Sequence, residues 1–402
     1  MNKKIFYAEA SYSKDEIKEV NKVLEESRLA LMDGPRVKEL ETKVAKLFNK
    51  SFGLMVNSGS SANLLGLLSL GLKKGTKVIT PALTFSTTVA PIVQSGLIPL
   101  FVDVDRNTLQ INTSILKKIN LDDVSAIFVP NLIGNIANWN EIYTFAKENN
   151  LKVIEDSADT IGYSYDSYLS NWSDISTTSF YASHVITGAG FGGMTCFDNK
   201  ENYELALSLR GWGRRSSLYI DSEDYERRFS SKIDDFFYDD KYIFDDIAYN
   251  MLPSEISAAF ALIQFKKLEN NINKRINNFN FLKENLSYSS NFYIPNTYEN
   301  VKTGWLAFPL IFQRQLANKR REIQIFLEKA GIQTRTIFTG NIMRQPVSKK
   351  FKWCSFGNFD VSDEVMKSGI LLGSHNRQPK ENLEYIILKI KEVEELLLKN
   401  KL

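Results

Sequence analysis

The sequence predicts an α/β fold, in which a large domain with a mainly parallel sheet between helices precedes a smaller C-terminal α+β domain. Brief apolar runs rich in β-branched residues alternate with helix-length amphipathic segments, which is typical of a parallel sheet. Beyond a long helical pattern that begins near Pro253, isolated strands and helices replace this alternation. A chain of 402 residues is also long enough to form two hydrophobic cores.

The elements are expected in this order. Apolar residues at helical spacing, with charged outer faces, predict two opening helices at residues 13–27 and 36–50. Short apolar runs predict strands at residues 52–56, 77–80, 98–105, 125–130 and 151–156, separated by helical segments such as 61–72 and 138–150. Residues 245–279 contain a long helix, and a strand at 304–312 and helices at 318–331 and 381–400 follow. We therefore expect a large domain over residues 1–252, and a bridging helix with a small domain over residues 253–402.

Composition excludes several classes of protein. A net charge of +3 from 50 basic and 47 acidic residues produces no strong field, so we expect neither nucleic acid nor a membrane as partner. No stretch approaches the roughly 20 apolar residues of a membrane span, and the start lacks the apolar region of a signal peptide. Two distant cysteines, Cys196 and Cys354, predict neither a disulfide framework nor a metal site, so we expect a cytoplasmic protein with reduced thiols.

The first motif, "VNSGSSANLLGLL", predicts a strand that ends at Val56, a small polar loop from Asn57 to Ser61, and a helix. Backbone N–H groups, hydroxyls and the positive end of a helix form a pocket suited to phosphate. A plain serine N-cap is the simpler interpretation of this segment.

Two further motifs end strands of the same predicted sheet. Phe85 follows one strand and begins a helix, where an aromatic ring can stack on a flat ligand or belong to the core. Glu155, Asp156 and Asp159 follow the strand "LKVIED", and a carboxylate buried there needs a cationic partner. N-capping of a following turn explains one of these acids, but three less easily.

The fourth motif, "SFYASHVITGAGFGGMTCFD", contains one of only two histidines in the chain. Ser179 lies five positions before His184, and a strand that ends near Phe180 can bring both toward one bound group. A lone histidine is more often a structural residue. Together, however, a phosphate pocket, an aromatic platform and a strand-end carboxylate suit a phosphorylated pyridine.

These motifs, in this order and spacing, resemble the DegT/DnrJ/EryC1/StrS family of nucleotide-sugar aminotransferases over essentially the whole chain. The matching segments are "VNSGSSANL", "TPALTFSTTVAPIVQSGLIPLFVDVD", "VIEDSADTIG", "TTSFYASH" and "AYNMLPSEISAAFALIQFKKL". The resemblance implies a fold-type I pyridoxal-phosphate protein and a homodimer with shared active sites.

The resemblance also implies roles for individual residues. Ser60, Ser61 and Ser179 would hold the cofactor phosphate, with Asn250 reaching in from a partner subunit. Phe85 would stack on the pyridine ring, and Asp156 would pair with the ring nitrogen. Asp159 occupies the place where many members carry a glutamine that binds the ring hydroxyl. Arg335 is a candidate contact for substrate phosphates or the glutamate carboxylate, and His375 a candidate structural or substrate-contact residue.

His184 falls on the position of the lysine that binds the cofactor covalently in the aminotransferases. No lysine occurs from Val153 through Asn199, so the cofactor, pyridoxamine or pyridoxal phosphate, is expected to be held noncovalently. Members with histidine here are sugar 3-dehydratases, some of which carry an iron–sulfur cluster. Two cysteines are too few for the roughly four ligands of such a cluster, so the cluster-free branch resembles this chain more.

The implied reaction is removal of the C3 hydroxyl from a nucleotide-linked 4-keto-6-deoxy sugar, with His184 as the base and L-glutamate as the amino donor that regenerates pyridoxamine phosphate. Two alternatives stay open: a 4-aminotransferase without the usual lysine, and a degenerate partner subunit. One departure concerns the glycine turn, which reads "GAGFGG" here and GEGG in many members. It puts the local backbone around His184 in question.

Overall fold

The computed structural model describes residues 4–26, 31–165, 171–219 and 221–399. Ser27 and Asn400, at the ends of two expected helices, lie outside these ranges. In the described part, an eight-stranded sheet has the order β1-β8-β7-β5-β4-β2-β3-β15. Its strands are β1 (Phe52–Val56), β2 (Lys77–Pro81), β3 (Ile98–Val102), β4 (Val124–Pro130), β5 (Lys152–Asp156), β7 (Ile175–Ser179), β8 (Gly193–Phe197) and β15 (Cys354–Ser355). Only β8 runs antiparallel to its neighbours, so the prediction of a mainly parallel sheet is confirmed.

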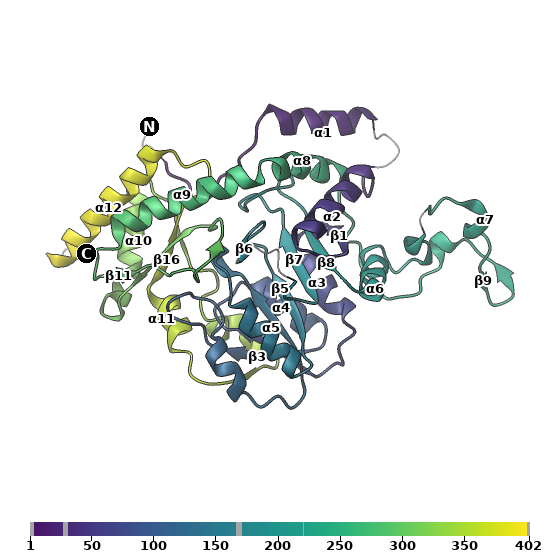
Figure 1. The fold of residues 1–402 in the computed structure, drawn as a ribbon, viewed down its shortest axis with the longest axis horizontal. Helices are drawn as coiled ribbons and strands as arrows, with labels where there is room; N and C mark the ends of the chain where they lie inside the picture. Colours follow the sequence, from purple (N-terminus) through teal and green to yellow (C-terminus); the bar gives the residue numbers. More distant parts are fainter. Residues whose placement is uncertain (1–3, 27–30, 166–170, 220, 400–402) are drawn as a thin grey trace.

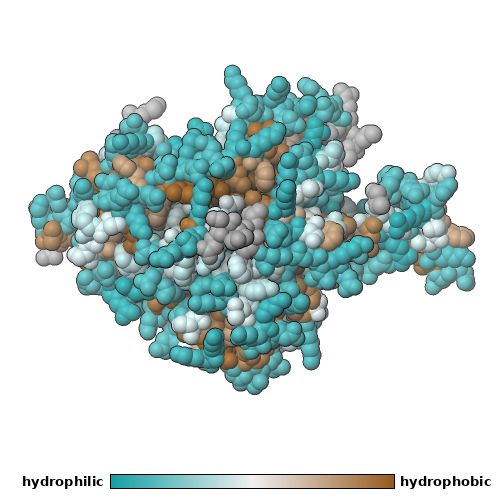
Figure 2. Space-filling view, in the orientation of Figure 1, coloured by the Kyte–Doolittle hydropathy of each residue, from teal (hydrophilic) through white to brown (hydrophobic). Residues whose placement is uncertain are grey.

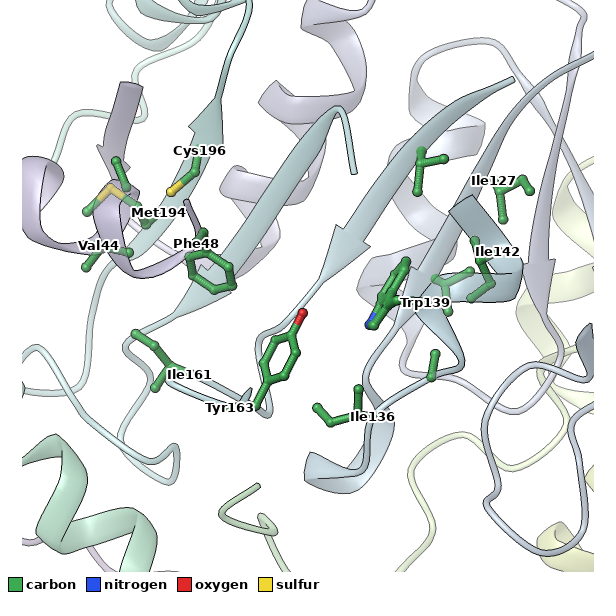
Figure 3. Close-up of a cluster of buried hydrophobic side chains, with 14 of the residues drawn as sticks. Val44, Phe48, Ile127, Ile136, Trp139, Ile142, Ile161, Tyr163, Met194 and Cys196 are labelled. Atoms are coloured by element: carbon green, nitrogen blue, oxygen red, sulfur yellow. The ribbon is translucent and has the colours of Figure 1, made fainter. Parts of the chain in front are cut away.

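Helices cover both faces of this sheet (Figure 1). They are α2 (Pro35–Leu47), α3 (Gly59–Ser69), α4 (Ser86–Gln94), α5 (Trp139–Glu148), α6 (Lys200–Arg210) and α8 (Glu255–Lys266). Helix α1 (Lys14–Glu26) packs against α8 instead. Side chains alternate along β4, so Ile127 packs with α2, α5 and α8 on one face, and Phe128 with α3, α4 and α6 on the other. Figure 3 shows the first face, where Val44 and Phe48 lie near Met194 of β8.

A second core forms around a four-stranded antiparallel sheet of order β11-β13-β16-β14. Its strands are β11 (Phe292–Tyr293), β13 (Phe308–Phe312), β14 (Thr334–Thr336) and β16 (Gly369–Leu372), and its helices are α9 (Leu268–Leu286), α10 (Arg320–Lys329), α11 (Asp360–Ser368) and α12 (Lys380–Leu398). Ile5, near the start of the chain, also joins this core and pairs with Ile332. The division into domains at residue 252 stays a prediction.

The long helix expected from Pro253 is two helices, so that prediction was wrong in one respect. Helix α8 ends and α9 begins at Lys267, whose backbone angles of φ −97° and ψ 1° leave the helical range. The Lys267 ammonium donates to Glu16 Oε1 at 2.7 Å, and this carboxylate of α1 is fully buried. The break in the helix thus coincides with an ion pair that ties it to α1.

An arm extends away from the body between α6 and α8 (Figure 1). It carries α7 (Tyr225–Arg228) and the hairpin of β9 (Lys232–Ile233) and β10 (Phe236–Phe237). Hydrophobic side chains show at its base and tip (Figure 2). A further strand pair joins β6 (Ser164–Tyr165) to β12 (Val301–Lys302). No described helix is long and apolar enough to cross a membrane.

Candidate active site

A cavity of about 520 Å³ lies at the carboxyl ends of the central parallel strands. Pro130, Asp156 and Ser179, the last residues of β4, β5 and β7, all line it. Ligands of open α/β sheets bind at this edge because the strand-to-helix loops converge there. Six of the residues singled out from the sequence line the cavity: Ser60, Phe85, Asp156, Asp159, Ser179 and His184.

The Asp156 carboxylate is buried at the base of the cavity. Its Oδ2 accepts hydrogen bonds from Asn63 Nδ2 and Thr88 Oγ1, both at 2.8 Å, and its Oδ1 accepts one from the Ala158 N–H at 3.1 Å. Burial raises the pKa of Asp156, although these three donors oppose the shift. No cationic side chain of the described residues pairs with Asp156. A positively charged group of a ligand in the cavity would therefore stabilise the ionised carboxylate.

His184 and Asp159 face each other across the cavity. Their closest atoms, His184 Nε2 and Asp159 Oδ1, are 3.8 Å apart. His184 Nδ1 lies 3.3 Å from the Ser179 carbonyl oxygen, a contact that favours a proton on Nδ1 and leaves the Nε2 lone pair toward the cavity. Burial lowers the pKa of His184 to about 4, which the Arg275 charge reinforces. Burial, and then the neighbouring Asp156 charge, raise the pKa of Asp159 to about 7.

The polar loop before α3 passes close to Ser179. Ser58 is the N-cap, and its hydroxyl accepts from the Ser61 N–H at 3.1 Å, so the serine cap expected as the simpler interpretation is present. A Cβ on Gly59 would lie 2.6 Å from Ser179 Cβ, which means that only glycine lets the two segments approach this closely. Ser60 is exposed and lines the cavity at the positive end of the helix.

Comparison with known proteins decides the family. The DegT/DnrJ/EryC1/StrS aminotransferase family matches residues 10–391. The chain belongs to this family. A GDP-4-keto-6-deoxy-D-mannose 3-dehydratase of Escherichia coli O55:H7 is 30% identical over 388 residues, which cover 94% of this chain and 97% of that protein. The lipopolysaccharide biosynthesis protein RfbH of Salmonella typhimurium is 33% identical over 365 residues, which cover 88% and 83%.

Solved structures agree with this assignment. A GDP-4-keto-6-deoxymannose-3-dehydratase with a trapped PLP-glutamate geminal diamine superimposes with a TM-score of 0.86 and 28% identity, over 96% of this chain and 99% of that one. This DegT/DnrJ/EryC1/StrS member therefore has the fold-type I architecture that the sequence motifs predicted. The predicted likeness to a GDP-4-keto-6-deoxy-mannose 3-dehydratase is confirmed as well.

Four residues expected in the family's active site do not line the cavity. The Ser61 hydroxyl donates to Asn57 Oδ1 at 2.6 Å instead. Asn250 lines a neighbouring hollow. Arg335 is exposed, and its guanidinium carbon lies 5.4 Å from the centre of the Tyr7 ring, which itself lines the cavity. His375 is only 2% exposed, and within the described part of the chain no hydrogen bond of ordinary geometry reaches either ring nitrogen.

In this family member, the glycine turn "GAGFGG" after His184 packs against the polar loop that runs from Asn57 to Ser61. Gly190 and Gly192 have φ of 96° and 109°, and Ala189 has φ of 55°, so the turn uses left-handed backbone at three positions. The Gly192 N–H donates to the Asn57 carbonyl oxygen at 3.0 Å, which docks the turn on the loop. Phe191 projects outward with 70% of its surface exposed, at the edge of the cavity.

The cavity wall also contains residues that the sequence analysis did not predict, among them Tyr7, Asn63, Thr88, Tyr181 and Phe338. Asn63 is the one amide side chain of α3 and lies between the apolar residues Ala62 and Leu64, and this pattern was the available signal for a buried hydrogen bond. Tyr7 and Phe338 come from distant parts of the chain, so no local pattern could place them. Among the residues that the structure describes, no group of three or more His, Cys, Asp or Glu side chains is arranged to hold a metal ion.

Proposed function

We propose that this chain is a 3-dehydratase that depends on pyridoxamine and pyridoxal phosphate and acts on a nucleotide-linked 4-keto-6-deoxy sugar. One observation carries the proposal: a histidine, His184, faces the cavity beside the buried Asp156, and no lysine is among the described residues that line it. Imidazole forms no stable imine with an aldehyde, so the cofactor would be held without a covalent bond.

The cavity fits this cofactor. Asp156 offers a buried carboxylate for a protonated ring nitrogen, and the half-exposed Phe85 offers a ring face beside it. Ser60, Ser179 and the start of α3 offer hydroxyls and a positive helix end for the phosphate. When bound, the cofactor supplies a primary amine and an electron-withdrawing ring, the chemistry on which loss of a hydroxyl next to a ketone depends.

His184 would act as the proton carrier. Because its pKa lies at about 4, the imidazole is neutral at pH 7 and Nε2 can accept a proton. Asp159 Oδ1, at 3.8 Å, lies where a carboxylate would stabilise the imidazolium as it forms. The same protonated His184 can then donate to the departing hydroxide.

The overall reaction balances with L-glutamate as the second substrate. Replacing the C3 hydroxyl by hydrogen releases water and takes up two electrons, and oxidation of glutamate to 2-oxoglutarate and ammonia supplies them and consumes one water. The sum is keto sugar plus glutamate giving 4-keto-3-deoxy sugar, 2-oxoglutarate and ammonia. By analogy with RfbH, which is named a lipopolysaccharide biosynthesis protein, we place this reaction in lipopolysaccharide biosynthesis. We further propose that it serves the O-antigen and takes place in the cytoplasm.

The decisive assay offers GDP-, CDP- and dTDP-linked 4-keto-6-deoxy sugars with glutamate and pyridoxamine phosphate. We expect a deoxy-ketone by mass spectrometry, together with equimolar ammonia. A 4-amino sugar without ammonia would instead establish the aminotransferase alternative. Failure of pyridoxamine phosphate to bind in a spectral titration would establish the degenerate partner subunit.

The working form would be a homodimer. The arm exposes large apolar side chains on an extension that buries little of its own surface: Leu218, Tyr225, Phe229, Phe236, Phe237 and Ile247. Such side chains are typical of an interface, and the adjoining hollow holds Asn250, the residue expected to serve the other subunit. Sedimentation equilibrium should show a dimer, and a monomer at micromolar concentration would contradict this part of the proposal.

A further inference from the structure

Arg275 of α9 is a buried arginine that joins two walls of the candidate site. Only 1% of its surface is exposed. Its Nη1 donates to the carbonyl oxygens of Trp305 at 3.2 Å and Leu306 at 3.0 Å. Its Nη2 reaches the carbonyl oxygens of Ser183 at 3.5 Å and His184 at 3.4 Å. Within the described part of the chain, no carboxylate lies within ion-pair distance of this guanidinium, although Asp159 and Tyr7 act on its charge from farther away. Its Nη hydrogen bonds all go to backbone carbonyl oxygens.

These contacts belong to a chain of hydrogen bonds that begins and ends at His184. Arg275 donates to the carbonyl oxygens of both His184 and Leu306, and the Leu306 N–H donates to the Ile133 carbonyl oxygen at 2.8 Å. The Ile133 N–H in turn donates to Asp159 Oδ2 at 2.9 Å. The other oxygen of Asp159 faces the His184 imidazole at 3.8 Å. One chain of hydrogen bonds thus connects the His184 backbone, through Arg275, Leu306 and Ile133, to the Asp159 carboxylate.

The choice of arginine has a physical reason. Burial of an ionised group without a counter-charge is costly, and burial lowers the pKa of Arg275 to about 10, which still leaves it protonated at neutral pH. A planar guanidinium has five donors in a fixed fork and can hold two segments at once, whereas a lysine ammonium acts as a single point. A side chain needed only to fill this space would be apolar.

We propose that Arg275 is a positioning residue that fixes the His184 segment relative to Leu306 and so sets the geometry of the His184 and Asp159 pair. This inference rests on the proposed function for the role of His184. The titratable or charged groups around the imidazole are Asp159, Arg275, Tyr181 and, next to Asp159, Tyr7. Arg275 is the cation of this set, and its charge favours the neutral imidazole.

The test compares Arg275→Lys and Arg275→Met with the same changes at Arg210. Arg210 is a matched control because it is also buried, at 3% exposed, but bonds to Glu41 and the Met55 carbonyl oxygen and does not line the cavity. The chain has only two histidines, so imidazole NMR signals can be assigned with a His375→Gln variant. The titration of His184 can thus be followed in the cofactor-free protein, without turnover.

For Arg275→Lys we expect a dehydration kcat that is about 10- to 100-fold lower, with KM and the dissociation constant for pyridoxamine phosphate within about twofold of wild type. Arg275→Met should move the His184 titration to higher pH, and neither Arg210 variant should move it. An unchanged kcat and His184 titration in Arg275→Lys would overturn the proposal, even if Arg275→Met fails to fold. If wild type performs no dehydration, the proposed function fails, and the NMR titration still decides whether Arg275 controls His184.

Discussion

His184 Nε2 lies 3.8 Å from Asp159 Oδ1, close enough for an ion pair whenever the imidazole is protonated and the carboxyl is ionised. With a pKa of about 4 for His184 and about 7 for Asp159, both groups are neutral between these pH values. Above pH 7, Asp159 is ionised beside a neutral imidazole. An ion pair between the two groups therefore requires an added proton on His184, which under the proposed function would come from the substrate.

The first prediction concerns the stability of Asp159→Asn. Because the folded-state pKa of Asp159 lies above its unfolded value, the folded protein binds this proton more tightly, and wild-type stability falls as the pH rises from about 4 to about 7. The amide of the variant cannot ionise, so the free energy of unfolding of Asp159→Asn should exceed that of wild type by on the order of a few kcal/mol at pH 8. In thermal melts of the cofactor-free proteins, the difference in Tm between Asp159→Asn and wild type should be larger at pH 8 than at pH 5. An equal difference at both pH values would contradict the burial argument, and the exposed Asp122→Asn is the control.

A second prediction concerns the identity of the base at position 184. His184→Asn should lose dehydration by about 100-fold or more, because it removes the proton acceptor but keeps a side chain of similar size. His184→Lys should bind the cofactor covalently, which borohydride reduction and intact mass would detect, and should also lose dehydration. His375 does not line the cavity, so His375→Asn should keep the wild-type activity. Covalent cofactor on the wild-type chain would disprove the noncovalent mode of binding.

Asp156→Asn should weaken cofactor binding, and the empty variant should lose less stability than the wild-type protein as the pH rises to 8. The buried Asp156 carboxylate has a raised pKa, so the wild-type protein loses stability as the pH rises, and an amide removes that loss. The affinity for pyridoxamine phosphate should fall at least about tenfold, because the ring nitrogen loses its anion. Spectral titration and thermal melts at pH 8 would measure both effects. As a control, Asp103→Asn should destabilise the protein, because the buried Asp103 accepts from the Val361 and Ser362 N–H groups, but it should leave cofactor affinity intact.

Gly59→Ala should lower the affinity for phosphate. Its Cβ would lie 2.6 Å from Ser179 Cβ, so one of the two segments must move by several tenths of an ångström. We expect cofactor affinity to fall about tenfold. The loss should be larger than in Ser60→Ala, because that variant deletes one hydroxyl but leaves the backbone in place. Competition with inorganic phosphate in the same titration would show whether the loss lies at the phosphate end of the cofactor. An affinity equal to wild type would mean that Ser179 is not held against this loop.

Much of the site could be predicted from the sequence. The features that could not be predicted were missed for one shared reason. Asp156 and Ser179 each end a recognisable strand, and Phe85 lies in the loop that follows another strand. The ends of parallel strands meet at one edge of a sheet. The break at Lys267 was missed because a buried partner in α1, Glu16, lies about 250 residues away in sequence. No local pattern of residues reports such a contact.

By itself, the sequence determined many of the strands and helices, the family, and the lack of any lysine from Val153 through Asn199, because periodicity, capping and motif order are local properties of the chain. Only the tertiary structure decided that Asn63 and Thr88 hold Asp156, that Asp159 faces the imidazole, and that Arg275 ties His184 to Leu306. It also decided that His375 is buried away from the cavity lining. These relationships depend on which distant segments pack together, and burial then sets the pKa values on which the proposed chemistry depends.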